Sequence, residues 1–97
     1  MPVKGNTWRV SADLVAVQFR QLDREFHNQL KGRKDLTIDC GSSARIDSAG
    51  IAWLLDCVKQ SKSQNVHLHI AGLSTQGYAL MEAHGVLSII EPYLERE

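Results

Sequence analysis

Short β-rich segments alternate with longer amphipathic segments along this chain, and no other feature constrains its fold as strongly. Apolar or β-branched residues recur at every second position, as expected for strands, within residues 7–11, 35–40 and 67–71. Apolar residues recur at three- and four-residue steps, as expected for amphipathic helices, within residues 14–30, 51–62 and 76–84. This order predicts an α/β fold with a small, mostly parallel sheet of about four strands covered by helices.

Several details of these elements can be predicted as well. The first β-rich segment is short, and we expect it to pair antiparallel at an edge of the sheet. Ile89 and Ile90 predict a final short strand, and Gly32 marks the end of the first helix. The apolar stripe of that helix consists of Val15, Phe19, Leu22, Phe26 and Leu30.

Length and charge limit the functions that the chain can perform. Its 97 residues are enough for a single domain spanning residues 1–97, which excludes large multidomain enzymes. The chain has 11 Lys and Arg against 11 Asp and Glu, with no basic run. Binding to a phosphate backbone needs an excess of positive charge, so nucleic acid is not expected as the primary partner.

The sequence also predicts a compartment. No segment approaches the roughly 20 apolar residues that span a bilayer, and the first six residues lack the apolar core of a signal peptide. We therefore expect a cytoplasmic protein that does not insert into the membrane. Cys40 and Cys57 lie in apolar segments, where we expect them to be buried free thiols.

Motifs for the common catalytic chemistries are missing. The sequence has neither a phosphate-binding Gly-Lys-Ser/Thr loop nor a glycine-rich dinucleotide turn, and its histidines lack the spacing of a metal site. His67 and His69 would share one face of a strand and could form a metal pair, but we expect solvated or interface side chains there. Ser48, Asp47 and a histidine are the residue types of a catalytic triad, but they are too common for their presence alone to indicate one. We expect no cofactor, no metal and no catalytic residue.

Residues 38–55 are the most informative segment. Asp47 directly precedes a helical pattern, where its carboxylate can cap the unpaired N–H groups of the first turn. Ser48 can present a hydroxyl or a phosphate at this partially positive helix end, while Ala49 and Gly50 leave the approach open. On spacing alone, the favoured interpretation is that Asp47 and Ser48 serve only as helix caps.

This segment resembles the STAS family, the sulfate-transporter and anti-sigma-factor-antagonist domains. The family pattern is a strand ending in Asp, a short loop and a helix start similar to Asp-Ser-Ser-Gly, which here reads Asp-Ser-Ala-Gly at residues 47–50. Residues 11–14 look like the family's Ser-Gly-Asp-Leu turn, and the segment from residue 67 to Leu73 also fits. The resemblance covers nearly the whole chain and implies a STAS-like fold.

Two branches of the family offer different functions. Anti-sigma factor antagonists such as SpoIIAA carry a phosphorylated Ser where this chain has Ala49, so a phosphorylation switch here would have to use Ser48. Proteins resembling MlaB have Thr at the position of Ser48 and Gly at that of Ala49, which is closer to this sequence. The MlaB resemblance implies a non-enzymatic cytoplasmic subunit of a phospholipid-transporting ABC complex, at the inner membrane, that binds the ATPase and maintains outer-membrane lipid asymmetry.

The helix that follows Asp47 predicts an interaction surface. At about 100° per residue its core stripe consists of Ile51, Leu54, Leu55 and Val58. Trp53 falls on nearly the opposite side, and we expect it to be exposed as an anchor for a partner, unless the C-terminal tail covers it. The expected partner-binding residues are Asp47, Ser48, Ala49, Gly50, Trp53 and Asp56.

Three functions follow from this reading. In the first, the partner is the ATPase subunit of an ABC transporter of the Mla type. In the second, the chain is an anti-sigma factor antagonist whose partner is an anti-sigma factor acting as a serine kinase on Ser48. In the third, the least favoured, it is a small hydrolase using Ser48. Ser74 and Thr75 could continue the same surface, because loops at the carboxyl ends of neighbouring parallel strands gather at one edge.

Overall fold

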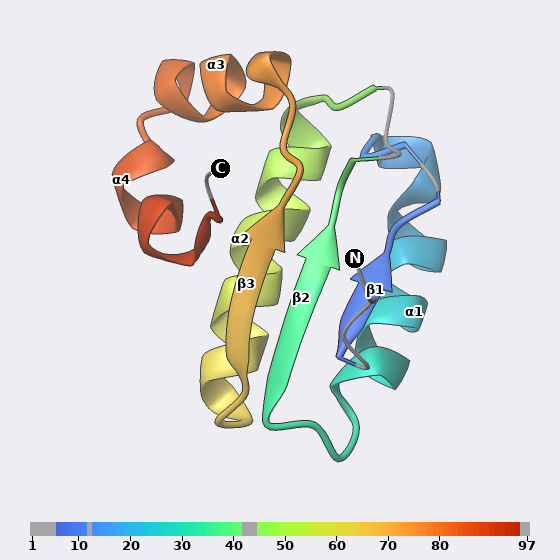
Figure 1. Ribbon diagram of the computed structural model, residues 1–97. Coiled ribbons are helices and arrows are strands. Elements are labelled where there is room, and N and C mark those ends of the chain that lie inside the picture. The colour runs from blue at the N-terminus through green and yellow to red at the C-terminus, as the bar shows by residue number, and fades with distance from the viewer. Residues whose placement is uncertain (1–5, 12, 42–44, 96–97) are drawn as a thin grey trace.

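The computed structural model describes residues 6–11, 13–41 and 45–95. Its elements in chain order (Figure 1) are β1 (Thr7–Arg9), the 3-10 helix η1 (Ala16–Gln18), α1 (Phe19–Leu30), β2 (Asp35–Asp39), α2 (Ser48–Ser63), β3 (His67–Ala71), α3 (Thr75–Ala83), α4 (Leu87–Ile90) and the 3-10 helix η2 (Glu91–Tyr93). The predicted turn at residues 11–14 and loop after Cys40 fall partly outside the described residues, at Ala12 and residues 42–44, as do both chain ends.

The strands form one parallel sheet in the order β1-β2-β3, with Trp8 beside Ile38 and Ile38 beside Ile70. The expected α/β architecture is confirmed, with three strands among the described residues instead of about four. The antiparallel pairing expected for the first strand is wrong. Helix α1 carries the chain back across the sheet between β1 and β2, so both strands run in the same direction.

The fourth strand expected at Ile89 and Ile90 is also wrong, because both residues belong to α4. Ile90 is fully buried and Ile89 is exposed. The chain returns to the sheet only at Leu94, which forms an isolated parallel bridge with Ile70. A pair of isoleucines has strand propensity, but here α4 needs one of them to face the core.

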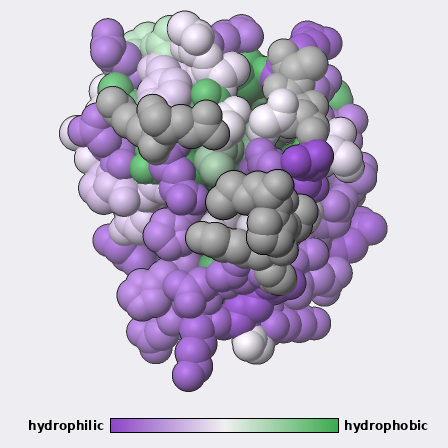
Figure 2. All heavy atoms as spheres, in the orientation of Figure 1, coloured by the Kyte–Doolittle hydropathy of each residue, from purple (hydrophilic) through white to green (hydrophobic). Residues whose placement is uncertain are grey.

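Helices α1 and α2 cover one face of the sheet (Figure 1). Alternate strand residues such as Leu36, Ile38 and Ile70 are fully buried. The residues between them lie on the opposite face, where His67 and His69 are exposed and Thr37 is half-buried. Figure 2 shows that this open face is mostly hydrophilic. The apolar core therefore lies between the sheet and the helices.

Helix α1 begins later than its periodicity predicts. Leu14 forms a bridge with Ile46, and η1 follows before α1 starts at Phe19. Of the predicted apolar stripe, the three residues that α1 buries are Leu22, Phe26 and Leu30. Val15 is half-buried and Phe19 is exposed, because both precede the part of the helix that packs on α2. Gly32 follows the helix with a φ of 70°, as expected for a stop.

Candidate functional site

The predicted cap at the start of α2 is confirmed. Asp47 has extended backbone angles, and its Oδ1 accepts a hydrogen bond from the Gly50 N–H at 3.0 Å. Its Oδ2 accepts a second bond from the Ala16 N–H at 3.3 Å. One carboxylate therefore ties the first turn of α2 to the segment that enters η1.

These hydrogen bonds set the charge state of Asp47. The Gly50 N–H holds the pKa of this carboxyl below its usual value, and the N–H groups of Ala16 and Ala49 and the charge of Arg45 act in the same direction. Desolvation opposes them but does not reverse the shift. Asp47 is therefore a carboxylate at neutral pH, which matches the partial positive charge of a helix N-terminus.

Backbone contacts brace the segment that leads into α2. The Leu14 N–H donates to the Arg45 carbonyl at 2.9 Å, and the Asp47 N–H donates to the Leu14 carbonyl at 3.0 Å. The Arg45 N–H donates to Oδ1 of Asp13 at 3.1 Å. The two segments form a short parallel bridge centred on Leu14 and Ile46. The start of α2 is thus held in place on both sides of its cap.

Gly50 allows the start of α2 to pack closely against the backbone at Leu14. It is buried, and a Cβ at this position would lie 2.1 Å from the Leu14 carbonyl oxygen. We expected Gly50 to keep a partner's approach open and to contact that partner. The structure corrects this, because the approaching group is the chain's own backbone at Leu14.

Ser48 is exposed at the first position of α2, as expected. Its Oγ lies 2.9 Å from Nε2 of His84, which is exposed just after α3. Sequence analysis did not find this histidine, because it lies 36 positions from Ser48 and no spacing rule links them. Ala49 is half-buried, and Ala52, one turn after Ser48, is exposed. We call Asp47, Ser48, Ala49, Ala52 and His84 the α2 N-terminal site.

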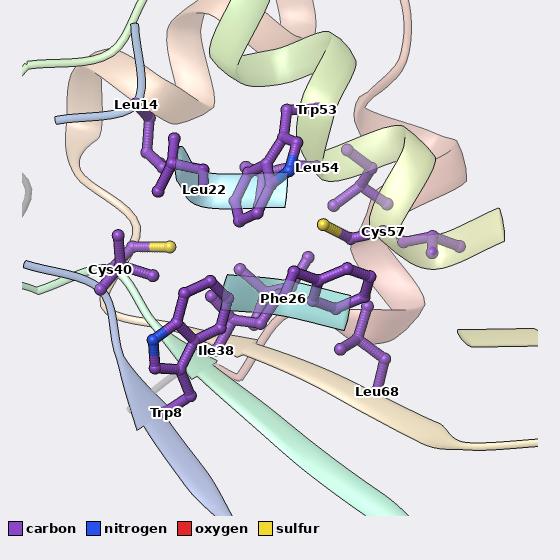
Figure 3. Packing of buried hydrophobic residues seen from close by; sticks show 14 of the residues in the cluster. Trp8, Leu14, Leu22, Phe26, Ile38, Cys40, Trp53, Leu54, Cys57 and Leu68 are labelled. Atoms are coloured by element: carbon purple, nitrogen blue, oxygen red, sulfur yellow. The ribbon is translucent and has the colours of Figure 1, made fainter. Parts of the chain in front are cut away.

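The structure contradicts the expectation that Trp53 is exposed. Its side chain is fully buried, with ring centroids 6.0 Å from both Trp8 and Phe26 in edge-on geometry. Figure 3 shows these three rings, from β1, α1 and α2, in the same interior. Trp53 is therefore part of the core, and the expected anchor for a partner is wrong.

The error came from the assumed width of the buried stripe. The helix α2 contacts α1 as well as α3, so its buried arc runs from Trp53 through Leu54 to Ile51 and spans about 160°. Trp53 lies at the edge of this arc that faces α1. Leu55, expected in the core, is only half-buried. A helix with neighbours on two sides buries more of its surface than a single stripe indicates.

Three further predicted positions are not part of the α2 N-terminal site. Asp56 is half-buried and accepts a hydrogen bond from Gln60 within α2. Ser74 caps α3, its Oγ accepting a hydrogen bond from the Gly77 N–H at 3.1 Å, and Thr75 is exposed beside it. The starts of α2 and α3 do share the edge at the carboxyl ends of the strands (Figure 1).

The described residues contain no cluster of three or more metal-binding side chains. Burial raises the pKa of Cys40 to about 12 and that of Cys57 well above its usual value, so both expected buried thiols are confirmed and poorly nucleophilic. Ser48 does contact His84, but the hydrogen bonds of Asp47 go to the backbone N–H groups of Gly50 and Ala16 and not to this histidine, so the described side chains do not form a triad.

Comparison with known proteins identifies the fold family. The sequence matches the STAS domain over residues 2–97. The chain belongs to the STAS family. This confirms the resemblance seen at residues 47–50, whereas the closeness to MlaB stays a prediction. No curated protein matches the chain.

Solved structures of STAS domains have the same fold. A sulfate transporter family protein from Wolinella succinogenes superposes with a TM-score of 0.74 at 13% identity, covering 92% of this chain and 74% of that one. The SulP transporter STAS domain from Vibrio cholerae has a TM-score of 0.67 at 10% identity, covering 96% and 75%. At these identities the likeness concerns the fold. Within the part of the STAS chain that is described, no helix is long and apolar enough to span a bilayer.

Proposed function

We propose that this STAS chain, as a single domain over residues 1–97, is a non-enzymatic cytoplasmic subunit that binds the ATPase of an ABC transporter. The transporter would move phospholipid at the inner membrane and maintain outer-membrane lipid asymmetry, and the chain would stabilise or regulate its ATPase. The contact surface is the α2 N-terminal site. This proposal needs neither a cofactor nor a metal, and it places the chain at the membrane only through its partner.

The observation that carries the proposal is a rigid and exposed helix start that lacks the family's usual phosphorylated residue. Position 49 is a half-buried Ala, whereas the regulatory antagonists have a Ser there. Without that hydroxyl the surface is suited to a lasting contact rather than to a switch at this position. One structural neighbour is described as a sulfate transporter family protein and the other as the STAS domain of a SulP transporter, so the fold itself occurs in transport proteins.

Each residue of the site has a definite role in this proposal. Asp47 holds the first turn through the Gly50 and Ala16 N–H groups. The Ser48 hydroxyl is exposed and can exchange its contact with His84 for one with the partner. Ala52 adds a small exposed side chain one turn away, which lets a partner helix or loop approach closely.

One observation favours a second function. Ser48 is an exposed hydroxyl at the first position of a 16-residue helix, where a phosphate would meet unpaired N–H groups. The alternative is therefore an anti-sigma factor antagonist that a serine kinase phosphorylates at Ser48. Phosphorylation would add up to two negative charges to the surface that we assign to the partner.

Affinity purification of the tagged chain from its native host, followed by mass spectrometry, tests the proposal. The variants are Ser48→Glu and Ala52→Arg, and the matched control is Ser63→Glu, an exposed Ser at the other end of α2. We expect wild type and Ser63→Glu to recover an ABC ATPase, and both site variants to lose it. Both altered residues are exposed, so the fold should be retained, which circular dichroism checks.

Two results would contradict the proposal. Recovery of a kinase-like anti-sigma factor, with phosphate mapped to Ser48, would replace it by the alternative function. Recovery of the ATPase by all variants equally would show that the contact lies elsewhere on the domain, and the α2 N-terminal site would then be wrong.

A further inference from the structure

The outer side of α1 and η1 is exposed and basic. Its exposed charged residues recur at helical spacing, at Arg20, Arg24 and Lys31, with Val17 on the same side and with uncharged residues such as Gln21 and Asn28 between them. Val17 is 86% exposed, whereas Phe19, at 39%, lies on the other side of the helix, in line with Leu22 and Phe26. The two acidic residues of α1, Asp23 and Glu25, are half-buried. We call Val17, Arg20, Arg24 and Lys31 the basic face.

The C-terminal part of the chain has the opposite character. Between Lys62 and Arg96 the sequence contains no Lys or Arg. The exposed residues of α3, α4 and η2 and of the segment after η2 include Glu82, Ile89, Glu91 and Glu95. Ile89 is 57% exposed and is the remaining large apolar side chain that the described chain exposes. We call these four residues the acidic face.

The two faces lie on opposite sides of the molecule. The strand order is β1-β2-β3, and α1 lies on the β1 side (Figure 1). The segment after η2 runs beside β3, where Leu94 bridges Ile70 and the Glu95 N–H donates to the Ile70 carbonyl at 2.8 Å. Helices α3 and α4 lie on the same side. A flat partner therefore cannot cover both faces at once.

We propose that copies of this chain associate head to tail, with the basic face of one copy on the acidic face of the next. The charges are complementary between the faces and repulsive within each face, so the contact pairs unlike surfaces. Each face also contributes one exposed apolar side chain, Val17 on the basic face and Ile89 on the acidic face, which the interface would bury among the charges. The formal net charge of zero means that whole copies do not repel one another.

The arrangement of the faces determines the kind of assembly. Two copies related by a twofold axis would place like faces together, which these charges disfavour. A contact between two different surfaces on opposite sides adds copies in a row, and it ends in a ring only if the rotation from copy to copy closes. The association should therefore grow with protein concentration beyond the dimer and weaken as salt screens the charges.

Sedimentation velocity of the purified chain alone tests this proposal. We expect the weight-average mass to rise past that of a dimer in low salt, and the association to weaken about tenfold in about 0.5 M NaCl. The basic-face variant Val17→Ser/Arg24→Ser and the acidic-face variant Ile89→Ser/Glu95→Ser should each stay monomeric. The control Lys59→Ser removes an equal charge from the exposed side of α2 and should assemble like wild type.

A mixture of the two face variants decides between head-to-tail and symmetric contacts. The acidic-face variant keeps an intact basic face, and the basic-face variant keeps an intact acidic face. An equimolar mixture should therefore form a complex of two subunits that stops there. A wild-type chain that stays monomeric up to about 1 mM overturns the proposal, and so does a closed dimer that either variant forms alone. Circular dichroism of each variant confirms that it is folded.

Discussion

The first turn of α2 and the middle of the same helix are built in different ways. The first turn exposes Ser48, and hydrogen bonds to Asp47 and the close approach of Gly50 to Leu14 hold this turn in place. The middle of the helix is held by the contacts of Trp53 with Trp8 and Phe26 in the core. The difference shows that one helix separates the two tasks, because its middle stabilises the fold while its start presents a surface.

The largest expected loss of stability comes from a substitution in the middle of α2. Trp53→Ala should lower the free energy of unfolding by roughly 4 kcal/mol, because it removes a large and fully buried ring from between two others. Trp53→Phe should cost much less, since it keeps an aromatic ring and removes an indole Nε1 that has no hydrogen-bond partner among the described residues. Urea unfolding followed by circular dichroism measures both. A stable Trp53→Ala variant that loses only its partner would instead make Trp53 a surface anchor.

Gly50 lies between the exposed start of α2 and its buried middle. Its replacement should cause the next largest loss of stability. In Gly50→Ala the new Cβ would collide with the Leu14 backbone, so α2 must shift, which should cost about 3 kcal/mol. Gly85→Ala is the control, because a Cβ there would meet nothing within 4 Å and only its φ of 70° is unfavourable, at about 1 kcal/mol. Equal losses in the two variants would show that the approach to Leu14 imposes no steric limit.

Sequence patterns correctly predicted the structural features that depend on residues close together in the chain. The Asp47 cap and the buried residues Leu22, Phe26 and Leu30 depend on neighbours within a few positions, and the structure confirms them. The segments that became β2 and β3 were predicted almost to the residue, because their alternation reflects one buried and one open face of the sheet.

Predictions that depend on distant residues were wrong or missing. The burial of Trp53 depends on α1 lying beside α2, and the direction of β1 depends on how the chain crosses the sheet. The contact between Ser48 and His84 joins residues 36 positions apart. Helical periodicity gives the direction of a side chain around its own helix, but the number of neighbouring helices decides which directions are buried.

The charge of Asp47 should make the start of α2 sensitive to acid. The pKa of Asp47 is lowered in the folded chain, chiefly by the Gly50 N–H, so its contribution to stability is complete above the unfolded pKa of about 4. That contribution is lost as the pH falls through the lower folded value. Asp47→Asn keeps a capping oxygen without the titration, so its stability should fall less than that of wild type between neutral pH and about pH 3. Urea unfolding at a series of pH values measures the stability of both proteins. An equal loss of stability in wild type and Asp47→Asn would show that Asp47 is not the source of the acid sensitivity.

The smallest expected effect on stability comes from replacing Ser48 or His84. These variants test most directly whether the start of α2 serves for binding and its middle for stability. Ser48→Ala and His84→Ala each remove one surface hydrogen bond, so each should change the free energy of unfolding by no more than about 0.5 kcal/mol. If the start of α2 serves for binding and its middle for stability, these two variants should weaken partner recovery while their unfolding curves coincide with that of wild type. A loss of stability as large as that of Gly50→Ala would mean that the pair helps to hold α2 against the end of α3, and the separation of the two regions would fail.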